Sequence, residues 1–175
     1  MIEVRLCKPE DAAAVSALLG ELGYEVSPQA AAERVRRLNE TGSDPTFITD
    51  DDGRPLGLIA LHHGHMIQYR SPVARITALV VNQTARRRGI GRMLIDHALR
   101  WAEQRGCELI ELTSALNRAR GAWLLPQLGL RGEFAALSQV AQGRLITRAC
   151  RPSRRHRRAG RDHRPWVLAV RHRHL

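Results

Sequence analysis

One segment constrains the fold more than any other. A β-rich apolar run, Arg75–Val81, leads through a polar loop into a long helical segment that starts at Gly89 and ends near Arg105. Apolar residues recur in that segment at intervals of three and four positions, which predicts a helix with one face packed on a sheet. A strand that feeds such a helix is typical of an α/β fold.

The loop that joins strand and helix is basic and contains two glycines, in the run Arg86-Arg87-Arg88-Gly89-Ile90-Gly91-Arg92. The start of a helix presents N–H groups without intrahelical acceptors and a partial positive charge, which together favour a bound phosphate. Gly89 and Gly91 carry no Cβ that would hold a phosphate away from the backbone. Because a short glycine pattern is weak evidence, an ordinary strand-to-helix turn with a solvated basic face is the alternative.

The spacing Arg86-x-x-Gly89-x-Gly91 resembles the Arg/Gln-x-x-Gly-x-Gly/Ala signature of the GNAT superfamily of N-acetyltransferases, and the resemblance covers roughly residues 2–117. A dinucleotide-binding Rossmann fold is the rival, but its fingerprint has three glycines and follows the first strand. Here the loop follows a hairpin and a central strand. The resemblance implies a mixed, mostly antiparallel sheet that is flanked by helices and has splayed central strands.

The resemblance also implies acetyl-CoA as co-substrate and direct transfer of the acetyl group to a primary amine in a ternary complex. Backbone groups before the loop would bind the pantetheine arm and the thioester carbonyl, the loop would bind the diphosphate, and an asparagine after the next strand would contact the arm. The residues that it assigns to the cofactor are Leu79, Val80, Val81, Arg86, Arg87, Arg88, Gly89, Ile90, Gly91, Arg92 and Asn117.

Candidate general bases are the histidines of the second hairpin strand, because histidine titrates near neutral pH. Alternation along a strand puts His63 and His65 on one face and His62 on the other, and the sequence does not decide which face meets the substrate. Glu111 is a further candidate. A polar strand-end residue is the alternative for each histidine, and a structural acid is the alternative for Glu111. The three cysteines match no metal-ligand spacing, so we expect no metal site.

After Asn117 the sequence departs from the family pattern. Leu125 stands where the family has a tyrosine near the sulfur, and Pro126 interrupts the expected helix. Codons for residues 122–134, read one base downstream, can spell His-Gly-Phe-Tyr-Arg-Ser-Ser-Gly-Phe-Glu-Glu-Ser-Ser, which looks like the missing segment. We therefore hypothesise that the chain from about residue 119 is an out-of-frame translation, without the last family strands and with reduced or absent turnover.

The net charge of the chain changes in the same region. Residues 1–143 hold 17 Arg or Lys and 16 Asp or Glu, a net charge of +1, whereas residues 144–175 hold 11 Arg and one Asp, a net charge of +10. We expect an acetyltransferase core over residues 1–118, a degenerate part over 119–143 and an irregular Arg-rich tail over 144–175. Such a tail would bind nucleic acid non-specifically, although no zinc, helix-turn-helix or RNA-recognition signature accompanies it.

Three functional alternatives remain at this point: an acetyltransferase, a nucleic-acid-binding protein that uses the tail, and a cofactor-binding pseudoenzyme. The acceptor is open between a small-molecule amine and a peptide amine, and a homodimer is one expected assembly. No apolar run reaches the length that spans a membrane. The first residues alternate like a strand rather than forming a signal peptide, so a cytoplasmic location without a membrane partner is expected.

Overall fold

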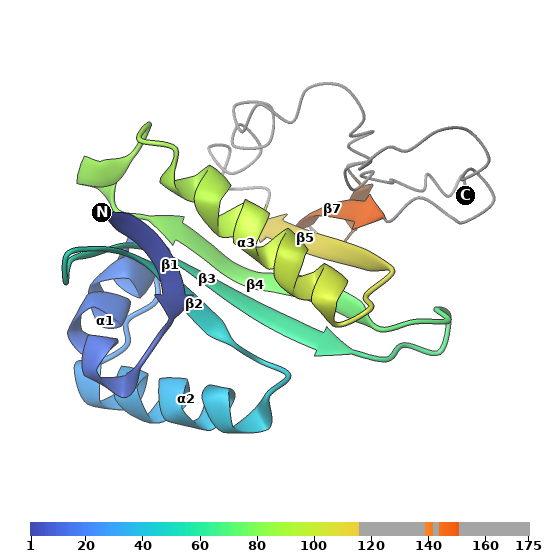
Figure 1. Ribbon diagram of the computed structural model, residues 1–175, viewed down its shortest axis with the longest axis horizontal. Coiled ribbons are helices and arrows are strands. Elements are labelled where there is room, and N and C mark those ends of the chain that lie inside the picture. The colour runs from blue at the N-terminus through green and yellow to red at the C-terminus, as the bar shows by residue number, and fades with distance from the viewer. Residues whose placement is uncertain (116–138, 142–143, 151–175) are drawn as a thin grey trace. The chain divides into compact units, whose positions relative to one another are not determined.

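The computed structural model describes residues 1–115, 139–141 and 144–150, which belong to two compact units (Figure 1). The first unit comprises Met1–Gly64 and Ile76–Trp101, and the second comprises His65–Arg75 and the described residues from Ala102 onward. The elements up to the third helix are β1 (Ile2–Leu6), a 3₁₀ turn (Pro9–Asp11), α1 (Ala12–Glu21), α2 (Pro28–Thr41), β2 (Thr46–Asp51), β3 (Pro55–Gly64), β4 (Val73–Val81), a second 3₁₀ turn (Gln83–Ala85) and α3 (Ile90–Gln104).

The strands of the first unit follow the order β1-β2-β3-β4. β1 pairs antiparallel with β2, and β2 pairs antiparallel with β3 across a tight turn in which Asp52 and Gly53 have positive φ. Such a two-residue turn matches the twist of the strands that it joins. The expectation of a mixed α/β fold with a mostly antiparallel sheet is therefore confirmed, whereas the splay of the central strands stays a prediction.

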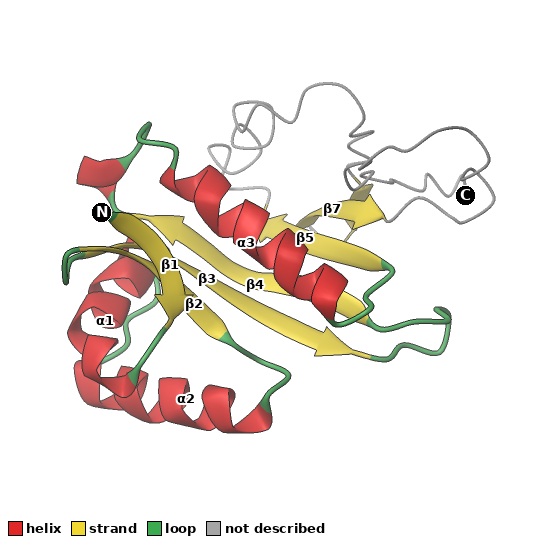
Figure 2. Cartoon of the chain, in the orientation of Figure 1, coloured by secondary structure: helices red, strands yellow, loops and turns green. Residues whose placement is uncertain are grey.

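Helices α1 and α2 lie on one side of the strands and α3 lies on the other (Figure 2). Successive residues of a strand point to opposite faces, so they meet different helices. Ile48 packs in a buried cluster with Val15 of α1 and Val35 of α2. The preceding residue, Phe47, instead contacts the ring of His97 on α3, with 4.4 Å between ring centroids. The two faces of the sheet in this unit are thus covered by different helices, α1 and α2 on one and α3 on the other.

The ends of α2 show why the chain turns where it does. Pro28 stands at the first helical position, and the Ser27 hydroxyl oxygen accepts a hydrogen bond from the Ala30 N–H at 3.2 Å. Gly42, with a φ of 65°, ends the helix. The helix runs to Thr41 because the stop is this glycine.

The second unit contains β5 (Leu109–Ala115), β6 (Gln139–Ala141) and β7 (Arg144–Cys150) in the order β5-β7-β6, with antiparallel pairing throughout. These strands differ from two expectations: that the last strands are missing, and that an irregular tail begins at residue 144. The run Leu-Ile-Thr at 145–147 has high β-propensity, and a ladder pairs backbone groups whatever the surrounding charge. Residues 116–138, 142–143 and 151–175 lie outside the description.

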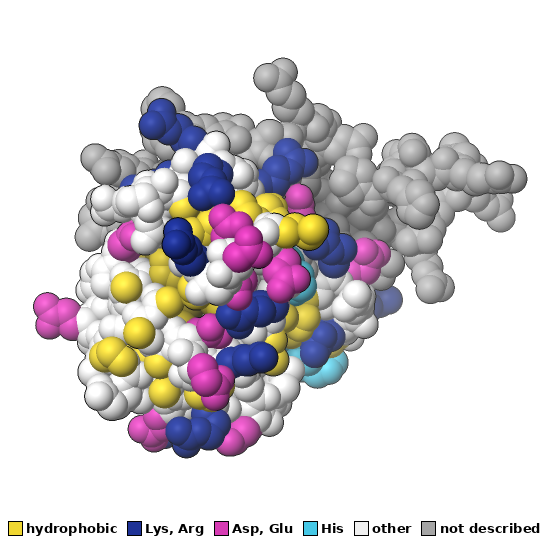
Figure 3. All heavy atoms as spheres, turned by 60° about the vertical axis from the view of Figure 1, so that its left-hand side comes forward, with side chains coloured by type: hydrophobic (Ala, Val, Ile, Leu, Met, Phe, Trp, Pro, Cys, Tyr) yellow, Lys and Arg dark blue, Asp and Glu magenta, His cyan; other side chains and the backbone are white. Residues whose placement is uncertain are grey.

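Acidic and basic side chains are intermingled on the face shown in Figure 3, rather than gathered into a patch of one sign. This agrees with the net charge of +1 over residues 1–143. Among the helices of the described residues, none is both long enough and apolar enough to cross a lipid bilayer.

Candidate phosphate-binding loop

The loop after β4 begins with a capped turn. The Asn82 N–H donates to the Leu56 carbonyl oxygen at 2.9 Å, which ties the loop to the start of β3. The Asn82 side-chain oxygen accepts from the Thr84 N–H at 3.0 Å and from the Thr84 hydroxyl at 2.6 Å. Such a side-chain cap satisfies N–H groups that the turn leaves without partners. The 3₁₀ turn is therefore held at its first residue, and its last residue, Ala85, is buried.

Positive backbone dihedrals then redirect the chain into α3. Arg87 has a φ of 64° and Gly89 a φ of 79°. The Gly89 carbonyl oxygen accepts from the Met93 N–H at 3.1 Å, which makes Gly89 the N-cap of a helix whose first residue is the buried Ile90. The N–H groups of this first turn have no acceptor within the helix and carry the positive end of its dipole.

The space beside Gly89 is open among the described residues. A Cβ added at Gly89 would meet no other heavy atom of the described residues within 4 Å. The positive φ disfavours any side chain there, although the space itself is open. Amide donors, a positive dipole end and an open approach are the features that a phosphate group needs, so the residues present fit the diphosphate that the sequence predicted.

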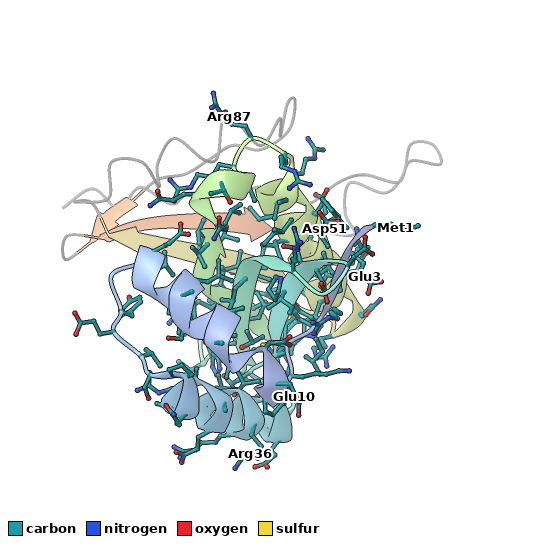
Figure 4. The ribbon with its side chains drawn as sticks, turned by 90° about the vertical axis from the view of Figure 1, so that its left-hand side faces the viewer. Met1, Glu3, Glu10, Arg36, Asp51 and Arg87 are labelled. Atoms are coloured by element: carbon teal, nitrogen blue, oxygen red, sulfur yellow. The ribbon has the colours of Figure 1, made fainter. Side chains whose placement is uncertain are left out.

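Several arginine side chains of the loop have acidic partners within the protein. Arg86 donates to a Glu21 carboxylate oxygen at 3.1 Å, and Arg88 donates to Asp51 at 3.3 Å. Arg92 lies 3.5 Å from Asp96, one turn further along α3. Arg87 projects outward from the loop (Figure 4). Since carboxylates already face several guanidinium groups, backbone amides are the main donors left for a phosphate.

The other predicted cofactor residues lie just before the loop or outside the description. Val80 is buried and Leu79 and Val81 are partly buried at the end of β4. The Val81 carbonyl oxygen accepts from Arg86 Nε at 3.3 Å. Asn117 lies outside the described residues. The assignment of these residues to the pantetheine arm stays a prediction.

The structure separates the hairpin histidines. Leu58 and Ala60 of β3 belong to the cluster that packs with α1 and α2, so His62, two residues further on, lies on that same face. His63 lies on the opposite face, where its ring meets the Trp101 ring of α3 edge-on at 6.0 Å. His65 is exposed and belongs to the second unit. No pair of them is brought together as a site within the described residues.

His62 has a charged partner that the sequence did not reveal. Its Nδ1 contacts a carboxylate oxygen of Asp44, which precedes β2. Burial raises the pKa of Asp44, but hydrogen bonds from Ser43, His62 and Thr41 outweigh it and leave this pKa below its usual range. Asp44 is therefore ionised at neutral pH and accepts the Nδ1 proton of His62. Sequence reasoning missed the pair because eighteen positions separate the two residues.

Glu111 is 3% exposed, and its carboxylate accepts from Arg75 at 3.0 Å. Burial in an ion pair favours the structural interpretation, while its role as a base stays a prediction.

The two described cysteines are also buried, and burial raises the pKa of Cys7 to about 12 and raises that of Cys107. Thiols held in this way are poor nucleophiles. No cluster of metal-binding side chains occurs in the part of the chain that the structure describes.

Comparison with known proteins adds independent information. A sequence model described as Acetyltransferase (GNAT) family matches residues 13–128. No curated protein matches the chain. Among solved structures, a transcriptional regulator from Bacillus halodurans C-125 is 20% identical, with a TM-score of 0.66 over 81% of this chain and 100% of that one.

Two further structures show the same arrangement. A ribosomal-protein-alanine N-acetyltransferase from Brucella melitensis is 19% identical, with a TM-score of 0.65 over 85% of this chain and 99% of that one. An aminoglycoside acetyltransferase from an uncultured soil metagenomic sample is 15% identical, with a TM-score of 0.65 over 81% and 93%. At these identities the likeness shows the fold.

Proposed function

Because this chain belongs to the GNAT acetyltransferase family, we propose that it transfers the acetyl group of acetyl-CoA to a primary amine, with residues 86–92 holding the diphosphate. The observation that carries the proposal is the start of α3, where Gly89 has a positive φ, caps the helix through its carbonyl oxygen and has open space beside its Cα. That arrangement suits a diphosphate and has no evident purpose in an ordinary packed turn.

Different segments of the chain would bind different parts of acetyl-CoA. The backbone of Leu79, Val80 and Val81 would align the pantetheine arm along the end of β4, and an N–H there would polarise the reacting carbonyl. The N–H groups at the start of α3 would bind the diphosphate. When bound, acetyl-CoA supplies the acetyl group as an activated thioester.

For the base, the geometry favours His62 over His63, His65 and Glu111. An ionised Asp44 that accepts from Nδ1 selects the tautomer with the proton on Nδ1, so that Nε2 carries the lone pair. The His62 side chain is 47% exposed, and Gly64 places no Cβ beside its Nε2, the atom that such a Cβ would approach to 3.4 Å. Nε2 would take the proton that the amine nitrogen loses.

The acceptor is proposed only as a class. The similar structures carry the names of enzymes with different acceptors, a ribosomal protein's alanine in one case and an aminoglycoside in another. Their common chemistry is a primary amine. A small molecule and a peptide N-terminus or lysine both belong to that class.

Turnover is proposed to be slow. Leu125 stands where the family places a tyrosine that protonates the leaving thiolate, and leucine has no proton to give.

Sequencing the gene tests the frame-shift hypothesis directly. Codons for residues 122–134 that do not spell the family-like string in the next frame would overturn it. Restoring that frame should raise the rate of thiol release.

The proposed function is tested by calorimetric titration of the purified chain with coenzyme A, followed by a thiol-release assay with acetyl-CoA and primary amines. We expect saturable binding and amine-dependent release of the thiol. A folded sample that binds no coenzyme A would overturn the proposal. Binding without any turnover, in this chain and in the frame-restored one, would favour the pseudoenzyme instead.

A further inference from the structure

A carboxylate on α1 reaches the candidate cofactor loop. Glu21 is the last residue of α1, and its side chain is only 16% exposed. One of its oxygens accepts from the backbone N–H of Gln83 at 3.1 Å, and the other accepts from the Arg86 guanidinium, also at 3.1 Å. The same carboxylate therefore holds both sides of the 3₁₀ turn that leads into the phosphate-binding segment.

The position of Glu21 is unfavourable for α1 taken alone. A negative charge at the C-terminal end of a helix lies next to the negative end of the helix dipole, which destabilises the helix. Partial burial of the carboxylate adds a desolvation cost. The contacts with Gln83 and Arg86 offset both, so the loop, rather than α1, accounts for an acid at this place.

Arg86 completes the connection. Its Nε donates to the Val81 carbonyl oxygen at 3.3 Å while its terminal nitrogen contacts Glu21. The guanidinium thus spans from the end of β4 to the end of α1. In this orientation the guanidinium fixes the loop between the two elements, and its positive charge is paired with the Glu21 carboxylate.

We propose that Glu21 is a positioning residue for cofactor binding. Through its contacts with Gln83 and Arg86 it holds the loop in the conformation that binds the coenzyme A diphosphate. This inference rests on the proposed function, because it assumes that the loop binds coenzyme A. Preorganisation improves affinity because less conformational freedom is lost on binding. The contact also links the cofactor loop to α1.

The experiment measures coenzyme A affinity by calorimetry in the full chain and in the variants Glu21→Gln, Arg86→Gln and the double variant. Glu25→Gln is the matched control, since it removes the same charge from an exposed residue four positions away. We expect each single variant to bind roughly fivefold more weakly. The double variant should be no weaker than either single variant, because both remove one connection. Circular dichroism should show every variant folded at the temperature of the titration.

Two results would overturn the inference while leaving the proposed function intact. The first is Glu21→Gln binding coenzyme A as tightly as Glu25→Gln does. The second is tighter binding by Glu21→Gln, which would show that the carboxylate competes with phosphate for Arg86. A folded parent chain that binds no coenzyme A would overturn the proposed function itself and this inference with it.

Discussion

Gly57 of β3 lies directly against the backbone of Val80 in β4: a Cβ added at Gly57 would stand 3.0 Å from the Val80 carbonyl oxygen. The same Cβ would lie 3.1 Å from Cγ2 of Ile90 and 3.2 Å from Cδ1 of Leu94. Glycine at this one position therefore lets the first turns of α3 pack closely against the sheet. The position of α3 on the sheet determines where its N-terminal amides point.

The variant Gly57→Ala should be destabilised by about 1–3 kcal/mol, because the added methyl group overpacks a contact made partly by backbone. It should also weaken coenzyme A binding by displacing the start of α3. Urea unfolding and calorimetric titration measure the two effects. Gly20→Ala is the control: a Cβ there meets nothing within 4 Å, and alanine favours a helix, so this variant should be slightly stabilised. Equal stability of the two variants would contradict the packing described for Gly57.

His62→Gln should lower kcat by roughly 100-fold if His62 takes the amine proton. The KM for acetyl-CoA should change little, because His62 is not part of the cofactor loop. Where turnover of this chain is too slow, the frame-restored chain serves for the same comparison.

The Asp44–His62 contact also has a readout that needs no turnover. Nitrogen-15 NMR should show neutral His62 with its proton on Nδ1 in the parent chain and a mixture of tautomers in Asp44→Asn. Asp52→Asn, in the exposed β2–β3 turn, should leave the spectrum of His62 unchanged. A proton on Nε2 in the parent chain would contradict the proposed role of Asp44.

His97 makes stability dependent on pH. Burial, with a smaller contribution from Arg100, holds the pKa of His97 below its ordinary value. The unfolded chain therefore binds the proton more readily, so the stabilisation is complete above the unfolded pKa of about 6.5 and declines as the pH falls below it. Urea unfolding should show a smaller loss of stability between neutral and mildly acidic pH in His97→Gln than in the parent. An identical pH dependence would contradict this account.

The last described strand decides where a truncation of the Arg-rich end of the chain should be made. Because Arg144–Cys150 form β7, a truncation that tests the tail should follow Cys150 rather than precede Arg144. The truncated chain should keep its melting temperature and its affinity for coenzyme A. Binding to a DNA duplex at low salt should weaken strongly. Loss of coenzyme A binding on this truncation would show that the account of the cofactor loop is incomplete.

The sequence predicted the parts of the molecule whose signals are local. The helix from Ile90 and its glycine-containing start depend on neighbouring residues, and the structure has them where they were expected. Long-range partners carried no such signal. The carboxylates of Glu21 and Asp44 reach Arg86 and His62 only through the fold.

The C-terminal strands were missed for a different reason. The abundance of arginine after residue 144 suggested an irregular tail, and this outweighed a short run of β-favouring residues. Strand β7 is specified largely by backbone pairing with β5, from Leu109↔Cys150 to Ala115↔Arg144, which no local pattern reveals. Which face of β3 each histidine occupies was likewise decided by what packs there, Trp101 against His63 and the α1–α2 cluster on the side of His62.

The central claim is that amides at the start of α3 bind the coenzyme A diphosphate, and amide NMR titration tests it most directly. Coenzyme A should shift the backbone N–H resonances of Arg87–Arg92, and pantetheine, which lacks the diphosphate, should leave them nearly unchanged. Saturable coenzyme A binding that shifts amides elsewhere but not in this segment would contradict the claim.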